Sequence, residues 1–292
     1  MDRGSHDTVH FFKMQGCGND FVLIDNRSPG LDPAFMAAWA QKLCRRAFGI
    51  GADGLILLDA APGRQDLDYL WHFFNADGSR AAMCGNGARC AAKLAVRLGL
   101  AGARHRFGSD AGTIEAEVFE DTGLVRVELT RPGPIEQGIV LDTPAGSLTA
   151  SFVNTGVPHA VVFLDDVAGV DVRELGAAVR YHARFAPAGT NANFAQVAGP
   201  GRLTLRTYER GVEGETYACG TGACATALAA RARGLGGDDY EILTSGGETL
   251  FVSVRGDRVF LTGAADEVFA GDFSPAALGL PGLRGGDASG GA

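Results

Sequence analysis

Two short motifs in the sequence each combine a reactive side chain with bare backbone. Residues 84–92 read Cys-Gly-Asn-Gly-Ala-Arg-Cys-Ala-Ala, and residues 219–227 read Cys-Gly-Thr-Gly-Ala-Cys-Ala-Thr-Ala. Both lead into Ala-rich segments that predict helices over 85–98 and 220–233. A cysteine at a helix N-terminus has a lowered pKa, because free N–H groups and the helix dipole favour the thiolate. The same N–H groups bind anions such as a carboxylate, and glycine lets a ligand approach them closely.

Two such thiols suit the inversion of a carbon centre. Inversion needs a base on one face and an acid on the other, so one of Cys84 and Cys219 would remove an α-proton while the other delivers one. A carboxylate held at the helix N-termini gains negative charge as the carbanion forms, and fixed donors then stabilise the transition state more than the ground state. This arrangement replaces the electron sink of a pyridoxal cofactor, so no cofactor is expected. The hypothesis requires that the two sulfurs face one another across one cleft.

Other uses of the cysteines stay open at this point. A thiol redox or metal protein could also use Cys84 and Cys219, and an isomerase could use this fold without thiol chemistry. The sequence contains no Cys-x-x-Cys pair, so zinc is disfavoured and no metal is expected. The remaining four cysteines, at positions 17, 44, 90 and 224, are predicted to be packing residues, although Cys17 lies in a Gly-containing loop and could also reach a site.

Many short strands and few helices are predicted around the two motifs. Strands are expected at 21–24, 55–58, 113–119, 124–129, 160–164, 193–197, 202–208, 249–254 and 258–262. Further helices are expected at 33–45 and 172–179. This mixture favours an α+β fold over a doubly wound sheet.

The repeated motif predicts two homologous lobes, each with one cysteine at the start of a central, buried helix. The N-terminal lobe is predicted to comprise residues 9–130 with about 264–280, and the C-terminal lobe residues 131–263. Residues 1–8 and the Gly-rich 281–292 are predicted to be disordered.

Composition excludes several classes of function. The 292 residues carry a formal charge of −8, from 26 basic and 34 acidic residues, so non-specific nucleic-acid binding is disfavoured. No run of 18 apolar residues exists, and no membrane span or signal sequence is expected. Six cysteines in a chain of this length do not form a disulfide framework. These features predict a cytoplasmic protein without nucleic-acid or membrane partners.

Several longer motifs resemble those of the diaminopimelate epimerases, which are pyridoxal-independent amino-acid epimerases. The matching segments lie at 13–21, 74–79, 84–90, 189–194 and 208–223, with further similarity over roughly 11–275. The resemblance implies two lobes, each with a curled mixed and antiparallel sheet around a central helix, and a site in the cleft between the lobes. It also implies interconversion of LL- and meso-2,6-diaminopimelate, for lysine and peptidoglycan precursor synthesis, by a homodimer without a cofactor.

The resemblance further implies roles for individual residues. Cys84 and Cys219 would be base and acid and would exchange these roles with the hand of the substrate, and His159 and Glu209 would support the proton transfers and the reacting amine. The reacting carboxylate would be held by Gly85, Asn86, Gly220 and Thr221, and the substrate's amines and distal carboxylate by Asn19, Asn75, Asn191 and Arg210.

Three positions depart from the family pattern. Val157 stands where the family often has Asn, Gly54 where some members have Gln, and Cys17 where the residue is often apolar. Val157 in particular keeps open a racemase of another amino acid on the same fold.

Overall fold

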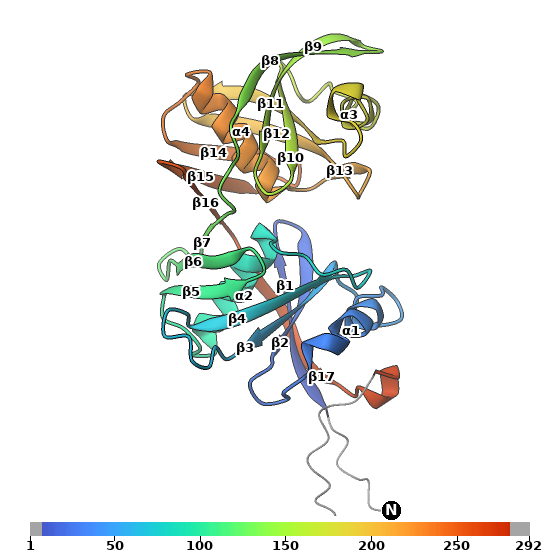
Figure 1. Cartoon of the computed structure of the whole chain (residues 1–292), viewed down its shortest axis with the longest axis vertical. Coiled ribbons are helices and arrows are strands. Elements are labelled where there is room, and N and C mark those ends of the chain that lie inside the picture. The colour runs from blue at the N-terminus through green and yellow to red at the C-terminus, as the bar shows by residue number, and fades with distance from the viewer. Residues whose placement is uncertain (1–7, 281–292) are drawn as a thin grey trace, which may run out of the picture. The chain divides into compact units, whose positions relative to one another are not determined.

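A computed structural model describes residues 8–280, and its internal contacts divide the chain into two compact units (Figure 1). The first unit is Met1–Gly123 together with Ala265–Ala292, and the second is Leu124–Ala264. The termini predicted to be disordered, 1–8 and 281–292, lie outside the described residues except for Thr8.

The first unit is a mixed sheet of seven strands with two α-helices. Its elements are β1 (Val9–Gly16), β2 (Asn19–Asp25), α1 (Met36–Leu43), β3 (Gly54–Asp59), β4 (Tyr69–Asn75), α2 (Gly85–Arg97), β5 (Arg104–Ser109), β6 (Gly112–Val118) and β17 (Asp266–Phe273). The strands pair in the order β17-β1-β2-β3-β4-β5-β6. The pairs β2–β3 and β4–β5 are parallel, and the others are antiparallel.

The second unit is also a mixed sheet with two α-helices. Its elements are β7 (Val125–Glu128), β8 (Glu136–Thr143), β9 (Gly146–Asn154), β10 (Pro158–Phe163), α3 (Val172–Arg180), β11 (Asn191–Gly199), β12 (Arg202–Glu209), β13 (Gly214–Thr216), α4 (Gly220–Ala232), β14 (Asp239–Thr244), β15 (Thr249–Arg255) and β16 (Arg258–Gly263). The order is β8-β9-β10-β11-β12-β14-β15-β16-β7, and the short β13 also pairs with β12.

The two units repeat the same topology. From β17 to β6 the pairings run antiparallel, antiparallel, parallel, antiparallel, parallel, antiparallel, and the pairings from β8 to β15 follow the same sequence. Helix α2 follows the fifth strand of the repeat, β4, and α4 follows β13, the short extension of the corresponding fifth strand, β12. Helices α1 and α3 each follow the third strand, β2 and β10. The predicted α+β fold with two homologous lobes is therefore confirmed, and the repeat reaches far beyond the two cysteine motifs.

Each cysteine motif opens a helix that is buried in its own unit (Figure 1). Helix α2 packs against β1, β2, β3 and β6, whereas α4 packs against strands β9 to β12 and β14 to β16. Ala, Gly and Cys side chains make this burial possible, because they let sheet strands approach the helix on several sides. Gly87 shows the tight fit, since a Cβ there would lie 3.1 Å from the Ile56 side chain.

The helix predicted over 33–45 is shorter than expected. Asp32 caps a 3-10 turn at Pro33–Phe35 by accepting from Ala34 N, and only Met36–Leu43 is α-helical. Proline is common in the first turn of an α-helix, but here the turn that begins at Pro33 is 3-10.

Candidate active site

In the first unit, Cys84 is the last extended residue before α2, with φ −145° and ψ 115°. Its Sγ lies 3.6 Å from the Oδ1 atom of Asn19, at the start of β2. An amide oxygen only accepts hydrogen bonds, so the Cys84 thiol is the donor in this contact. The side chain of Asn86 donates to the same oxygen from its Nδ2 atom, 3.5 Å away. The structure thus brings Cys84, Asn86 and Asn19 together, as the resemblance implied for a common site.

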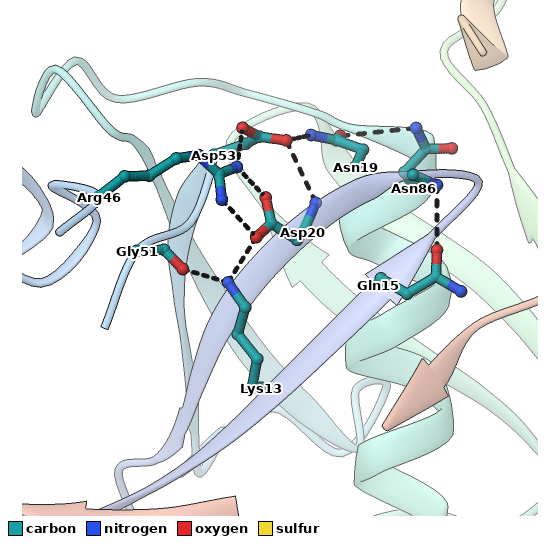
Figure 2. A network of polar contacts seen from close by, with 9 residues as sticks. Lys13, Gln15, Asn19, Asp20, Arg46, Gly51, Asp53 and Asn86 are labelled. Carbon is teal, nitrogen blue, oxygen red and sulfur yellow. Dashed lines mark hydrogen bonds and ion pairs between the residues drawn. The ribbon is translucent and has the colours of Figure 1, made fainter. Parts of the chain in front are cut away.

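Asp53 fixes the orientation of the Asn19 amide (Figure 2). Asn19 Nδ2 donates to Asp53 Oδ2 at 2.6 Å, and a carboxylate only accepts, so the amide nitrogen must face Asp53. The same carboxylate oxygen accepts from the backbone N–H of Asp20 at 3.2 Å. Asn19 Oδ1 is therefore directed at the start of α2.

A charged network behind Asp53 holds this arrangement in place (Figure 2). Arg46 donates to Asp20 at 2.6 Å and to Asp53 at 3.0 Å, and the nearly buried Lys13 donates to Asp20 and to the carbonyl of Gly51. Burial raises the pKa of Asp20, but the hydrogen bonds from Arg46 and Lys13 outweigh it and lower that pKa to about 2. Asp20 is consequently a fixed negative charge at neutral pH.

Asn75 lies at the end of β4, opposite Gly54 in the β3–β4 register. Its Nδ2 donates to Ser79 Oγ at 2.9 Å, within the turn that follows the strand. A Cβ at Gly54 would lie 2.6 Å from the ring of Phe73 and 2.9 Å from the carbonyl oxygen of Phe74. This packing gives a physical reason for glycine at a position where some family members carry Gln.

In the second unit, Cys219 takes the same place before α4, with φ −123° and ψ 108°. Its side chain is largely buried, at 8% exposure, and its Sγ lies 3.4 Å from Thr221 Oγ1. A hydroxyl can donate to sulfur, so the neighbour of this thiol differs in kind from the Asn19 oxygen near Cys84. The carbonyl oxygen of Thr221 accepts from Thr155 Oγ1 at 3.0 Å, which holds the first turn of α4 against the β9–β10 turn.

His159 is fully buried at the start of β10 and contacts Thr221. Its Nε2 lies 3.0 Å from Thr221 Oγ1, and its Nδ1 lies 3.1 Å from the side-chain nitrogen of Asn193. Burial and, next, the positive charge of Arg210 lower the pKa of His159 to about 3. The ring is neutral at physiological pH and its two nitrogens have different roles.

Asn191, Arg210 and Glu209 lie at neighbouring strand ends of the second unit. Asn191 is buried; its Nδ2 donates to the carbonyl of Pro158 at 2.8 Å, and its Oδ1 accepts from the backbone N–H of Arg210 at 2.8 Å. Asn191 therefore ties the Arg210 backbone to the start of β10. Glu209 accepts from the hydroxyl of Thr216 at 3.0 Å.

The other cysteines lie in the protein interior, as their predicted packing role requires. Cys17, Cys44, Cys90 and Cys224 are each at most 4% exposed. Burial raises the pKa of both Cys44 and Cys90 to about 12, so neither thiol ionises near neutral pH. The sulfur of Cys17 lies 3.2 Å from the guanidinium of the buried Arg89, which belongs to the same α2 helix that Cys84 precedes.

Within residues 8–280, no group of three or more His, Cys, Asp or Glu side chains is placed to hold a metal ion. The helices in the described part of the chain include none with both the length and the apolar character needed to cross a membrane.

Sequence reasoning missed two residues that hold the site residues in place, Asp53 and Asn193. Asn193 could have been found from the spacing of Asn191-Ala192-Asn193, because side chains two apart on a strand face the same side. Asp53 directly precedes the strand that pairs with β2 in parallel, so it lies beside the first residues of β2. That neighbour relation follows from the sheet topology and not from the local sequence.

Comparison with known proteins adds the decisive observation. The family model described as diaminopimelate epimerase matches residues 11–133 and 151–268 of this chain. A diaminopimelate epimerase of Aquifex aeolicus (strain VF5) is 44% identical over 280 residues, covering 92% of this chain and 99% of the relative. The chain belongs to the diaminopimelate epimerase family. A relative of the same name from the archaeon Methanocella arvoryzae is 40% identical over 274 residues, covering 90% of this chain and 96% of the relative.

Solved structures show how widely the fold of this diaminopimelate epimerase family member is used. A probable proline racemase from Agrobacterium radiobacter K84 superposes with a TM-score of 0.66 at 17% identity, covering 90% of this chain and 92% of that one. A hydroxyproline epimerase from Agrobacterium vitis gives a TM-score of 0.66 at 16% identity, with 93% of each chain covered. At these identities the likeness concerns the fold alone.

Proposed function

We propose that this chain interconverts LL-2,6-diaminopimelate and meso-2,6-diaminopimelate by proton transfer through two thiols, without a cofactor. Membership of the diaminopimelate epimerase family supports the reaction. The single structural observation that carries the mechanism is the repeated placement of Cys84 and Cys219. Each is the extended residue before a buried helix, and each has a polar side chain within 3.6 Å of its sulfur.

The proposed reaction breaks the C–H bond at the α-carbon of the substrate and forms it again on the opposite face. The thiolate of one cysteine takes the α-proton and becomes a thiol, while the electron pair of the C–H bond stays on the substrate as a carbanion delocalised into its carboxylate. The other cysteine then delivers its thiol proton to the opposite face of that carbon and becomes a thiolate. Charge and protons balance, and the enzyme is left with the two cysteines in exchanged protonation states.

The carbanion is the costly species, and we propose that the helix N-termini stabilise it. The substrate carboxylate would receive hydrogen bonds from the backbone N–H groups at Gly85, Asn86, Gly220 and Thr221. Because its negative charge increases as the proton leaves, these fixed donors act most strongly in the transition state. The buried helices keep the donors rigid, so no reorganisation is required during the reaction.

The remaining predicted residues would orient the substrate. Asn19, Asn75 and Asn191 are proposed to hold its amino groups and distal carboxylate, and Arg210 to bind that carboxylate with a forked ion pair. Asn191 would act partly through Arg210, since its amide oxygen accepts from the Arg210 backbone. Glu209 is proposed to hold the reacting amine.

His159 is proposed to support proton transfer without exchanging a proton itself. It is fully buried and the pKa of its ring lies near 3, so it is neutral while the thiols react. Its Nε2 contacts Thr221 Oγ1, and the same hydroxyl contacts Cys219 Sγ. His159 would therefore act on Cys219 through Thr221.

Exchange of the α-hydrogen with solvent tests the proposed reaction. In D₂O, wild-type enzyme should incorporate deuterium at the α-carbon of LL- and meso-diaminopimelate and should convert each to the other. The Cys84→Ser and Cys219→Ser variants serve as controls and should invert the carbon at least about 10²-fold more slowly. Absence of exchange with either epimer would reject the function.

A racemase of another amino acid is the second candidate, and Val157 is the observation that favours it. The same exchange assay on a panel of amino acids separates the two. Fast exchange with another amino acid and none with diaminopimelate would establish the racemase instead.

We also propose that the enzyme works as a homodimer in the cytoplasm, in lysine and peptidoglycan precursor synthesis. Thiol chemistry needs reduced cysteines, which the cytoplasm maintains. Strand β17 exposes Val268 and Phe269, which a second copy would cover. Light scattering gives the mass in solution, and a monomer at working concentration would exclude the dimer.

A further inference from the structure

We propose that Asn193 is a positioning residue that sets the hydrogen-bond direction at Cys219. It fixes the proton of His159 on Nε2, and the Thr221 hydroxyl hydrogen is thereby directed to Cys219 Sγ. The effect of Asn193 on catalysis rests on the proposed function. The three hydrogen-bond directions do not, because they involve only residues of this chain. Asn193 lies on β11 and is completely buried.

The first step is the orientation of the Asn193 amide. Its Nδ2 lies 3.0 Å from the carbonyl oxygen of Ala160, and its Oδ1 lies 3.0 Å from Thr207 Oγ1. A backbone carbonyl only accepts hydrogen bonds, so the amide atom that faces Ala160 must be the nitrogen. The opposite orientation would place two acceptors against each other in a fully buried place, at a high cost.

The second step is the tautomer of His159. The same Nδ2 atom of Asn193 lies 3.1 Å from His159 Nδ1, and a nitrogen that receives an N–H bond carries no proton of its own. The ring is neutral, because it is buried and the positive charge of Arg210 faces it. Its single proton is therefore on Nε2.

The third step is the direction of the Thr221 hydroxyl. His159 Nε2 donates to Thr221 Oγ1 at 3.0 Å and uses that oxygen as an acceptor. The hydroxyl hydrogen of Thr221 remains for the sulfur of Cys219, 3.4 Å away. A hydrogen bond donated to sulfur favours the thiolate over the thiol.

Gly222 shows how closely the motif is fitted to Asn193. A Cβ at position 222 would lie 2.5 Å from Asn193 Oδ1. Any side chain there would displace the Asn193 amide or push the first turn of α4 away from it. The second glycine of the Cys-Gly-x-Gly motif therefore serves this buried amide as well as the helix start.

Nitrogen NMR of the histidine rings in the full-length wild-type protein tests the first two steps. The His159 signals, assigned by their loss in His159→Gln, should show the Nε2–H form alone across neutral pH. An Nδ1–H form, a mixture of tautomers or a charged ring would overturn the proposal. This measurement needs no substrate, so its failure is distinct from a failure of the proposed function.

The pH dependence of alkylation at Cys219 tests the third step. Iodoacetamide labelling is followed on the peptide that contains Cys219, and its midpoint reports the pKa of the thiol. In Asn193→Leu the midpoint should rise by about one pH unit and kcat should fall about tenfold with KM nearly unchanged. Thr226→Val, which removes an equally buried hydroxyl that donates only to the Gly222 carbonyl, should move neither.

A second pair of variants keeps the test valid if Asn193→Leu does not fold. Thr221→Val removes the hydroxyl and should raise the Cys219 midpoint as Asn193→Leu does, whereas Thr221→Ser keeps the hydroxyl and should leave it near the wild-type value. An unchanged midpoint in folded Asn193→Leu or in Thr221→Val would overturn the proposal.

Discussion

The two units place a cysteine at the same point of the same topology but surround it differently. Cys84 lies next to the acceptor oxygen of Asn19, which a half-exposed and charged network holds in place. Cys219 lies next to the hydroxyl of Thr221, which a buried and neutral network holds in place. The backbone of the repeat has been kept, whereas the side chains that contact the sulfurs have diverged.

This difference separates the roles of two thiols that are otherwise alike. An acceptor stabilises the protonated thiol, and a donor stabilises the thiolate. A proton transfer through two groups needs one of them protonated and the other not, and environments that shift their pKa values apart supply that state before substrate binds. The free enzyme is accordingly expected to hold a thiolate at Cys219 and a thiol at Cys84.

Replacing either thiol should have the largest effect. Cys84→Ser and Cys219→Ser should each lower the rate of epimerisation by about 10² to 10⁴, the range expected for loss of a general acid or base. Cys90→Ala is the matched control, because the pKa of the Cys90 thiol is raised to about 12 by burial and it takes no part in proton transfer. Normal turnover by one serine variant would remove that thiol from the mechanism, and normal turnover by both would leave the thiols no role.

The ionisation of the two thiols should differ in the wild-type enzyme. Alkylation of both cysteines in one sample, followed on separate peptides as the pH is raised, should show a midpoint for Cys219 about one unit or more below that for Cys84. The midpoint does not depend on the greater exposure of Cys84, which changes only the rate. Equal midpoints, or a lower one at Cys84, would break the contrast between the units.

Breaking the charged network of the first unit should lower kcat/KM by about the free energy of one hydrogen bond. Asp53→Asn frees the Asn19 amide to rotate, because an amide at position 53 can donate to Asn19 Oδ1 as well as accept from Nδ2. We expect kcat/KM to fall about fivefold, equivalent to about 1 kcal/mol. Asp66→Asn, which breaks an exposed pair with Arg64, is the control and should leave kcat/KM unchanged. If kcat/KM fell equally in both variants, the loss would come from the change in net charge and not from the orientation of Asn19.

The buried network of the second unit should be visible in the pH dependence of stability. The pKa of His159 falls from 6.5 to about 3 on folding, mainly through burial. Below pH 6.5 the unfolded chain therefore takes up a proton that the folded protein does not. The stability gained from the neutral ring is complete above that pH, and it falls by up to about 1.4 kcal/mol per pH unit on acidification toward the folded-state value.

Urea unfolding at one-unit pH steps measures this slope. His159→Gln should be less steep by that amount over the same range. The carboxyl of Asp20, whose pKa is lowered from 3.8 to about 2, also affects stability at the acid end of this range, but it is present in both proteins and cancels in the comparison. Equal slopes in the wild type and the variant would mean that His159 binds its proton equally well in the folded and unfolded states, which would contradict the lowered pKa.

The sequence predicts the repeated features well, because two copies of a motif carry information that one copy lacks. The positions of Cys84 and Cys219 before buried helices follow from Cys-Gly-x-Gly-Ala and the Ala-rich segments. The contacts of each sulfur are not predictable in this way. Asn19 is far from Cys84 in the chain, and His159 is far from Thr221, and each pair is brought together by strand pairings that local patterns do not reveal.

The helix over 33–45 and the role of His159 illustrate the same limit. The apolar spacing predicts one helix, but Asp32 and Pro33 start a 3-10 turn, and local capping sets the boundary. His159 is recognisable as distinctive because it follows Val157-Pro158, yet only its burial shows that it stays neutral.

The distribution of deuterium between the two epimers at the earliest stage of reaction tests the two-thiol account most directly. When wild-type enzyme acts on protiated LL-diaminopimelate in D₂O, the meso product should carry deuterium at the inverted carbon while the remaining substrate keeps its hydrogen. The base that takes the proton and the acid that supplies the deuteron are then different groups. Deuterium appearing equally in both epimers from the start would mean that a single group serves both faces, and would contradict the account.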